Sequence, residues 1–305
     1  MTAIGRRESA AAGAEGRAAW LMALPALTGL ILFVAVPFAA AVALSFTNLR
    51  LGSPLPLSFA GLEQYRRIFS DEGFRRALFN NALFAFVAVP LQTGLALALA
   101  LMLNRPFPGR ALVRTLFFMP VVFPMSLVAV VWILIYAPGP NGMMNALLGI
   151  LTLGAWHARD FLHDTLWAFP AVLLLSVWQG LGFQMVILLA GLQAIPVDLY
   201  EAAAMDGANR WHRFWHVTLP QLRNPLLFVT LVTMILAFRL FDQVQIMTQG
   251  GPNNATATVM FETVRAVFER QQVARASAMT VVFFVIVLVI TAVQRRVARQ
   301  QREID

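Results

Sequence analysis

The chain has 305 residues, of which 59% are hydrophobic and only 12% are charged. Soluble domains carry about 25% charged residues, so this composition excludes a soluble protein and indicates an integral membrane protein. The formal net charge is +8 and all 23 basic residues are arginine. The arginines lie at the edges of apolar segments, which favours orientation in a bilayer over nucleic-acid binding. The chain has no cysteine, which excludes disulfides and cysteine-bound metals.

Six apolar segments are each long enough to cross a bilayer, whose core of about 30 Å requires roughly 20 helical residues. The predicted spans are 19–46, 77–104, 115–137, 166–192, 225–247 and 276–294. The sequence therefore predicts an all-α integral membrane protein with a six-helix domain over residues 19–294 and tails at 1–18 and 295–305. Within the first segment, Ala41-Val42-Ala43 fits a signal-peptide cleavage site, but the apolar run is long enough to span instead.

The distribution of arginine predicts the orientation of these spans. With six crossings both tails lie on one side, and that side carries 13 arginines against nine on the other. The short loop 105–114 and the C-terminal cluster contribute most to this bias, and positive charge is retained on the cytoplasmic side. We expect both termini, and the polar loop between the fourth and fifth spans, to be cytoplasmic.

That loop, over residues 196–222, is the longest polar-rich stretch of the chain. Pro196 ends the preceding span, and Asp198 is predicted to cap a short helix with Glu201 as its capping-box partner. Gly207 breaks the helix, and Asn209 is predicted to cap a second one that Leu219-Pro220 ends.

An aromatic face is predicted on the second short helix, because Trp211, Phe214 and Trp215 have i, i+3, i+4 spacing. Two interpretations remain open on these residues alone. The loop is either an amphipathic segment at the lipid headgroups or a docking element whose aromatic side chains enter a groove on a soluble partner.

The same stretch resembles the EAA loop of permease subunits of binding-protein-dependent ABC importers. The resemblance rests on Glu201-Ala202-Ala203, on Gly207 six residues later, and on Leu219-Pro220 at the end. The flanking segments IPVDLYEAAAMDGA and RLFDQVQIMTQGGPNNAT are similar to the sugar-uptake branch of that family.

The resemblance implies a six-helix permease that works beside a second permease, two ATPase subunits and an extracytoplasmic solute-binding protein in a bacterial or archaeal cytoplasmic membrane. It implies that the loop docks into the ATPase through Glu201, Ala202, Ala203, Asp206, Gly207, Trp211, Phe214, Trp215, Leu219 and Pro220. ATP and magnesium would be bound by that partner, and this chain would have no cofactor of its own.

The sequence carries no motif for chemistry of its own. A GxxxxGK[ST] loop cannot occur without lysine, and no G-x-S-x-G motif is present, so we expect no enzymatic activity. His212 and His216 have metal-ligand spacing, but no third ligand lies nearby, whereas a site needs three or four. We therefore predict no metal site and no nucleic-acid partner.

Arg239 and Asp242 are charged residues within the predicted fifth span. Three positions apart, they are predicted to pair on one helix face, which lowers their cost in the membrane. They either hold this helix against its neighbours or form a polar wall of a translocation pathway, and the second interpretation is favoured because intramembrane charges usually face water or substrate.

Polar and aromatic residues also mark the fourth span, where Ser176, Gln179, Gly180 and Phe183 lie within two turns of one another. Small and aromatic residues are common at helix crossings in membranes, so packing alone explains them. The Ser176-x-Trp178-x-Gly180 pattern, however, resembles the sugar-contacting helix of maltose permease subunits, which implies contact with the solute at Ser176, Gln179, Gly180 and Phe183.

The predicted function is therefore half of an ATP-driven import pathway for a sugar or sugar-like solute. A permease for a polyol phosphate or another small polar solute is the alternative within this class. A self-sufficient secondary transporter is the rival class, but it should consist of two related halves, and the sequence contains no convincing internal repeat.

Overall fold

The structure is a computed structural model that describes residues 20–300, without the side chains of residue 295 and residues 297–300. The predicted tail 1–18 and the end of the C-terminal tail, 301–305, lie outside the described residues. The described chain is almost entirely helical, and its only strand-like pairing is an isolated bridge between Thr47 and Phe59. The expected all-α membrane fold is confirmed.

Four continuous helices are long and apolar enough to cross a membrane: Trp20–Ser45, Glu72–Leu103 (α4), Ala168–Gln193 (α8) and Val273–Gln294. The first contains a π-helical turn, Ile31–Ala35, followed by α2, Val36–Ser45. The last belongs to α15, Val273–Gln300. Two bent helix pairs bring the number of candidate spans to six if each pair counts as one: Arg110–Val122 with Met125–Ile135, and Arg210–Gln221 with Arg223–Phe238.

The first bent pair replaces the continuous third span that the sequence predicted. Helix α5, Arg110–Val122, and helix α6, Met125–Ile135, meet at 105°. Phe123 between them is extended, with φ −84° and ψ 141°. The residue that precedes a proline is pushed out of helical geometry, and Pro124 therefore breaks the helix inside an otherwise apolar run.

The predicted fifth span is also discontinuous. Helix α12, Arg223–Phe238, ends before Arg239, and the chain resumes as α13, Asp242–Met247. The freed carbonyl groups are satisfied by side chains: Asn81 donates to the Phe238 carbonyl at 3.4 Å, and Thr258 donates to the Leu240 carbonyl at 2.7 Å. Non-helical backbone at membrane depth requires such partners because no water replaces them.

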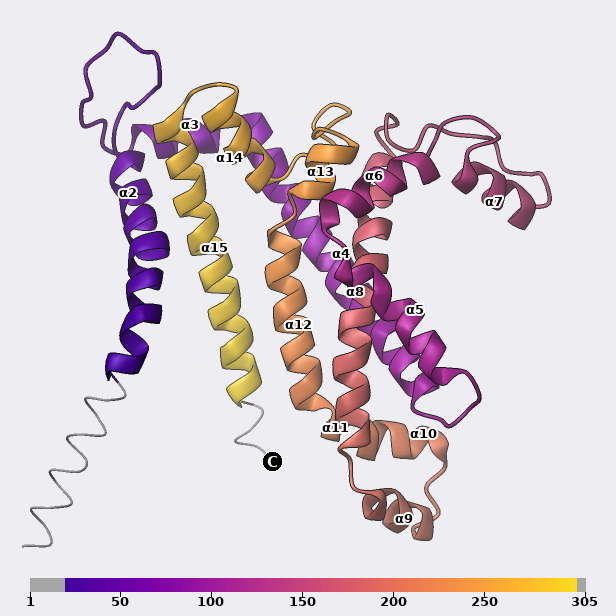
Figure 1. The fold of residues 1–305 in the computed structure, drawn as a ribbon. Helices are drawn as coiled ribbons and strands as arrows, with labels where there is room; N and C mark the ends of the chain where they lie inside the picture. Colours follow the sequence, from indigo (N-terminus) through magenta and orange to yellow (C-terminus); the bar gives the residue numbers. More distant parts are fainter. Residues whose placement is uncertain (1–19, 301–305) are drawn as a thin grey trace, which may run out of the picture.

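Short helices cover one end of the bundle, which we call the α3 end. They are α3, Glu63–Ser70; α7, Met143–Leu151; α13; and α14, Val259–Phe268 (Figure 1). Helix α4 begins here, five residues before the predicted span, with Asp71 as its N-cap accepting a hydrogen bond from the Phe74 amide at 2.8 Å.

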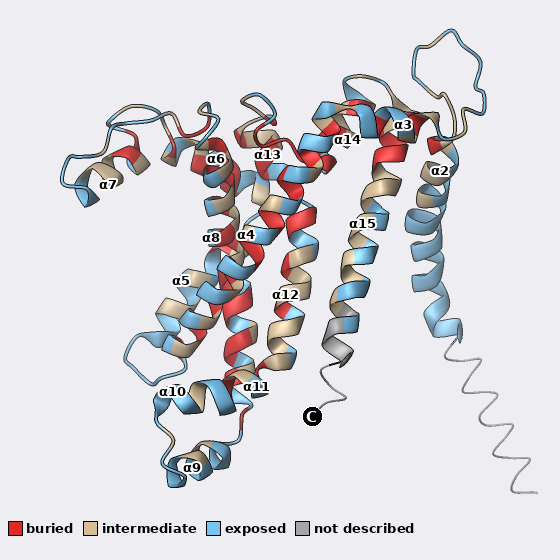
Figure 2. Ribbon diagram, turned by 180° about the vertical axis from the view of Figure 1, so that it is seen from behind, coloured by how far each residue is buried: buried red, intermediate tan, exposed pale blue. Residues whose placement is uncertain are grey.

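The opposite end of the bundle, the α9 end, carries a hairpin built from α9, Val197–Met205; α10, Arg210–Arg213; and α11, Leu219–Gln221 (Figure 1). Buried residues follow α4 and α8 through the centre of the molecule, whereas α2 is exposed along most of its length and lies beside α15 (Figure 2). The rings of Phe38 and Phe284 join α2 to α15 at 4.4 Å. Exposed apolar helix faces of this extent are suited to contact with lipid.

Candidate functional site

A cavity of about 290 Å³ lies among the central helices. Helices α4, α6, α8, α12 and α13 and the break after α12 line it with Phe84, Ala88, Gln92, Met125, Ser176, Gln179, Gly180, Thr233, Leu236, Ala237, Arg239, Asp242 and Gln243. We call it the helix-break cavity, because its wall includes Met125, which follows the break between α5 and α6, and Arg239 and Asp242, which flank the break between α12 and α13. Discontinuous membrane helices commonly form solute sites in this way.

Three hydrogen bonds fix polar side chains on the wall of the helix-break cavity. Gln243 on α13 donates through Nε2 to Ser176 Oγ at 3.0 Å, and Ser176 donates to the Val172 carbonyl at 2.8 Å. Gln179 donates through Nε2 to the carbonyl of Phe123 at 3.1 Å, the residue between α5 and α6. Gln179 therefore lines the cavity and also satisfies the backbone of the third-span break.

Arg239 and Asp242 do not share a helix face as predicted. Arg239 follows the last residue of α12 and Asp242 is the first residue of α13, so the break separates them. No ion pair joins the two side chains within the described part of the chain. Both are exposed on the wall of the cavity, so each presents a charge to whatever occupies it.

Glycine on α8 permits close approach of α4 and α5. A Cβ at Gly180 would overlap the Gln92 side chain, and one at Gly182 would overlap the backbone of Phe117 and Phe118. The lack of a side chain at Gly180 therefore leaves the space that the Gln92 side chain occupies on the cavity wall. Phe183, three positions further along α8, is 37% exposed and is not part of the cavity lining.

Gln92, Thr233 and Gln243 line the cavity although the sequence analysis did not name them. Gln92 and Thr233 are polar residues within otherwise apolar spans, a signal that could have marked them. Thr233 accepts a 2.5 Å hydrogen bond from Gln184 Nε2 on α8, so it also joins the two helices. Their approach in space depends on packing between distant segments, which sequence spacing does not reveal.

The hairpin at the α9 end starts with α9, Val197–Met205, and its cap differs from the prediction. Pro196 is the N-cap residue, no side chain caps the helix, and Asp198 lies in the first turn. The predicted capping box between Asp198 and Glu201 is therefore wrong. Proline holds a backbone conformation compatible with a helix start, and the N-cap lies two residues earlier than a box at Asp198 requires.

The turn of the hairpin follows the expected residues. Gly207 has φ +76°, a conformation that side chains disfavour and glycine adopts readily. Asn209 caps α10, Arg210–Arg213, by accepting a 2.9 Å hydrogen bond from the His212 amide.

The second arm continues beyond its predicted end at Leu219-Pro220. A π-helical turn, Phe214–Thr218, is followed by α11, Leu219–Gln221, so proline occupies the first turn of α11 rather than terminating a helix. Thr218 donates to the Arg213 carbonyl at 3.3 Å within the π-helical turn, and its hydroxyl lies 3.0 Å from that of Tyr200 on α9. This contact holds the two arms together.

Three aromatic rings cluster on the second arm. Trp211 lies 6.1 Å from Phe214 and 5.6 Å from Trp215, between ring centroids, and Phe214 lies 5.4 Å from Trp215. Trp211 is 67% exposed and Trp215 45%. Glu201, Ala202, Asp206 and Gly207 on the other arm are also exposed, and Ala203 is half-buried. The hairpin thus presents apolar rings and a carboxylate at its surface.

The chain resembles a known family over most of its length. Residues 92–303 match the family described as binding-protein-dependent transport system inner membrane component. The chain is 34% identical to the trehalose/maltose transport system permease protein MalF of Thermococcus litoralis, with 95% of this chain and 96% of that protein covered. It is 33% identical to the sulfoquinovosyl glycerol transport system permease protein SmoG of Agrobacterium fabrum, covering 92% and 89% respectively.

The lactose transport system permease protein LacF of Rhizobium radiobacter is 31% identical, over 93% of this chain and 94% of that protein. Among solved structures, a bacterial ABC transporter that imports the acidic polysaccharide alginate contains a chain with a TM-score of 0.80, 21% identity, and coverage of 94% and 96%. This likeness supports the fold. The chain belongs to the family of binding-protein-dependent transport system inner membrane components.

Proposed function

We propose that this chain forms half of the translocation pathway of an ATP-driven importer for a sugar or sugar-like solute. The proposal rests on one observation above all: a polar cavity at two helix breaks and an exposed hairpin occur in the same chain, linked by α8 and α12. Family membership supplies the context, and relatives whose names specify trehalose or maltose, sulfoquinovosyl glycerol and lactose favour a carbohydrate.

The chemistry of the cavity suits a hydroxyl-rich solute. Gln92, Gln179 and Gln243 offer amide groups, Arg239 a donor and Asp242 an acceptor. Hydroxyl groups both donate and accept hydrogen bonds, so a wall with both kinds of partner fits them. The small volume is consistent with half of a pathway whose other half comes from a second permease.

The hairpin at the α9 end is proposed to dock into an ATPase subunit. Its exposed aromatic cluster would supply the apolar contact, and Glu201 a polar one, because aromatic side chains dominate the energetics of many interfaces. In this account two ATPase subunits bind ATP and magnesium, an extracytoplasmic protein delivers the solute, and both termini and the hairpin are cytoplasmic. The lipid-surface interpretation of the hairpin requires none of these partners.

Uptake by cells that express the intact importer tests the proposed pathway. Gln92→Ala removes a cavity amide that makes no hydrogen bond within the described part of the chain, and it should reduce uptake and change the preference among maltose, trehalose and lactose. Gln193→Ala, at the exposed end of α8, is the matched control and should transport normally. Wild-type uptake and preference in Gln92→Ala would contradict a pathway through this cavity.

The same uptake assay tests whether the solute contacts Phe183 as well as the residues that line the cavity. The maltose-permease pattern implies that Phe183 contacts the solute, although its side chain is outside the cavity lining. Phe183→Ala should alter uptake only if a second permease closes the pathway over this exposed ring.

Single cysteines at positions 208 and 255, labelled from opposite sides of the membrane, test the orientation of the chain. Labelling of position 208 from outside would exclude a cytoplasmic hairpin.

A further inference from the structure

The α3 end contains a second, smaller pocket of about 120 Å³ whose polar wall is rich in arginine. Arg50, Arg67 and Arg275 line it together with Asn48, Gln64 and Gln272. None of these residues lines the helix-break cavity or belongs to the hairpin at the α9 end. We call it the arginine pocket.

Main-chain hydrogen bonds build this pocket from two segments that are distant in the sequence. The Leu51 amide donates to the Gln271 carbonyl at 2.9 Å, and the Ala274 amide donates to the Leu49 carbonyl at 3.0 Å. Gln64 on α3 donates to the Thr47 carbonyl at 3.0 Å and fixes a third side. The wall is therefore held in place independently of the long arginine side chains.

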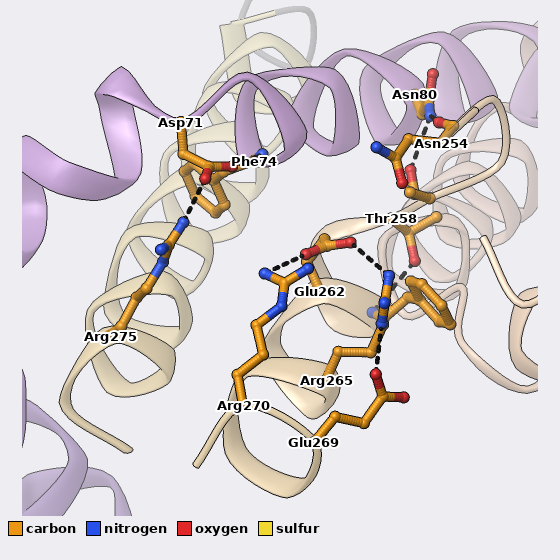
Figure 3. Close-up of polar contacts among 12 residues, drawn as sticks. Asp71, Phe74, Asn80, Asn254, Thr258, Glu262, Arg265, Glu269, Arg270 and Arg275 are labelled. Carbon is orange, nitrogen blue, oxygen red and sulfur yellow. Dashed lines mark hydrogen bonds and ion pairs between the residues drawn. The ribbon is translucent and has the colours of Figure 1, made fainter. Parts of the chain in front are cut away.

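Acidic neighbours neutralise only part of the positive charge here. Arg67 pairs with Glu63 at 2.9 Å on the exposed surface, and Arg275 pairs with Asp71 at 2.5 Å (Figure 3). Among the described residues, Arg50 forms no ion pair and Arg275 Nε has no hydrogen-bond partner. Residues 48–76 and 262–275 together contain eight arginines and five acidic residues, a net charge of +3. Acidic side chains therefore do not neutralise all the arginines around the pocket.

The position of the arginine pocket indicates which anion it receives. Its residues directly follow the first span, which ends at Ser45, and flank the start of α15 at Val273. Exposed apolar side chains, Phe59 and Leu62, lie beside it in the chain. The ends of apolar spans lie at the depth of the lipid headgroups, where phosphates are the abundant anions.

We propose that the arginine pocket binds the phosphate of an anionic phospholipid headgroup at the α3 end. Guanidinium groups form charge-assisted hydrogen bonds with phosphate oxygens in matching geometry, and a diester phosphate could engage Arg50 and Arg67 without breaking the Arg275–Asp71 pair. Acyl chains attached to it would then run along the exposed flank of α2 and α15. The bound lipid would join the first external loop to the turn before α15.

Lipid retention by the purified, assembled complex tests the proposal. The delipidated complex is titrated with dioleoylphosphatidylglycerol and measured by native mass spectrometry, with dioleoylglycerol and inorganic phosphate as separate arms. Arg50→Gln and Arg67→Gln should each weaken phosphatidylglycerol binding about tenfold, as expected for loss of a hydrogen bond between charged groups. Arg66→Gln and Arg76→Gln remove the same charge from exposed positions outside the pocket, so they should bind as wild type does.

Phosphatidylglycerol binding that is lost only in the two pocket variants, with no binding of dioleoylglycerol, supports the proposal. Equal binding in all four variants, or equal loss in the controls, would overturn it. Binding of inorganic phosphate without phosphatidylglycerol would overturn the lipid as the source of the phosphate. Arg50 lies in a loop and Arg67 is half of an exposed pair, so both variants should fold, and unchanged ATPase content of the complex verifies this.

Discussion

At the α3 end, buried amide and hydroxyl side chains tie distant segments together, whereas the hairpin at the α9 end has few internal ties and exposes its largest side chains. Asn80 donates to the carbonyls of Asn254 and Ala257 at 3.0 and 2.8 Å, and its neighbour Asn81 joins the Phe238 carbonyl to the Val259 amide (Figure 3 shows Asn80). In the hairpin, one hydroxyl contact, between Tyr200 and Thr218, joins the arms.

This contrast indicates that the asparagine contacts of the α3 end are satisfied within the chain, whereas the surface of the hairpin is not covered by it. Buried amide groups that are hydrogen-bonded, as those of Asn80 and Asn81 are, specify one arrangement of the segments that they join. Exposed aromatic rings are costly in water and typical of a surface that a partner covers. Variants at the α3 end, in the packed centre and in the hairpin test this contrast, and each has a matched control.

Loss of the Asn81 side chain should produce the largest effect. Asn81 is fully buried, and Asn81→Ala leaves the Phe238 carbonyl and the Val259 amide without partners. Each buried group left unsatisfied costs about 1–3 kcal/mol, so we expect about 2–4 kcal/mol of destabilisation and a lower midpoint of thermal unfolding in detergent. Asn104→Ala, at the exposed end of the same helix, should change the midpoint little.

A methyl group at Gly182 should have the next largest effect. Its Cβ would overlap the backbone of Phe117, which cannot move as a flexible side chain does. Overpacking typically costs about 1–3 kcal/mol, so Gly182→Ala should lower the unfolding midpoint. Nothing lies within 4 Å of a Cβ at Gly94 on α4, so Gly94→Ala should be neutral or slightly stabilising. Equal midpoints in the two variants would contradict the close approach of α5 to α8.

The smallest effect concerns the acid sensitivity of the α3 end. Burial raises the pKa of Asp71, but the Phe74 amide and the Arg275 guanidinium outweigh it and lower the pKa below its ordinary value of 3.8. The charged form therefore stabilises the fold fully above the ordinary pKa, and this contribution is lost as the pH falls through the lower pKa of the folded protein.

Asp71→Asn should reduce stability near neutral pH and flatten the loss of stability below about pH 4. Glu72→Gln removes one negative charge from the exposed first turn of the same helix without affecting the Arg275 pair, and its acid profile should resemble wild type. Unfolding midpoints measured from pH 3 to 7 distinguish the two variants. Parallel profiles for Asp71→Asn and wild type would show that the Arg275 pair adds no pH-dependent stability.

The sequence predicted continuous, charge-free spans well and missed the breaks. Helix α8 lies within two residues of its predicted bounds because no charged residue interrupts it. The breaks at Phe123 and after Phe238 lie inside predicted spans, and the groups that satisfy their carbonyls, Gln179 and Asn81, come from other helices. Such long-range partners leave no local pattern in the sequence.

For the same reason, only part of the cavity lining could be predicted from the sequence. Ser176, Gln179 and Gly180 repeat on one helix at a spacing that reveals a shared face, and the structure brings them to one wall. Gln92 does not repeat with other polar residues at helical spacing, so its place in the cavity follows only from the packing of α4 against Gly180. The exposed aromatic cluster of the hairpin was accessible to sequence reasoning because i, i+3, i+4 spacing determines it locally.

The central claim, that the hairpin at the α9 end couples to an ATPase, is tested most directly by co-purification. Trp211→Ala, Glu201→Lys and Gly207→Val are compared with Phe59→Ala, which removes an 82% exposed ring at the α3 end. Loss of an aromatic anchor of about 2 kcal/mol weakens an interface roughly 30-fold. The account predicts that the three hairpin variants insert normally but lose ATPase and solute-stimulated ATP hydrolysis, while Phe59→Ala retains both. Full ATPase retention with full uptake in all four variants would contradict it.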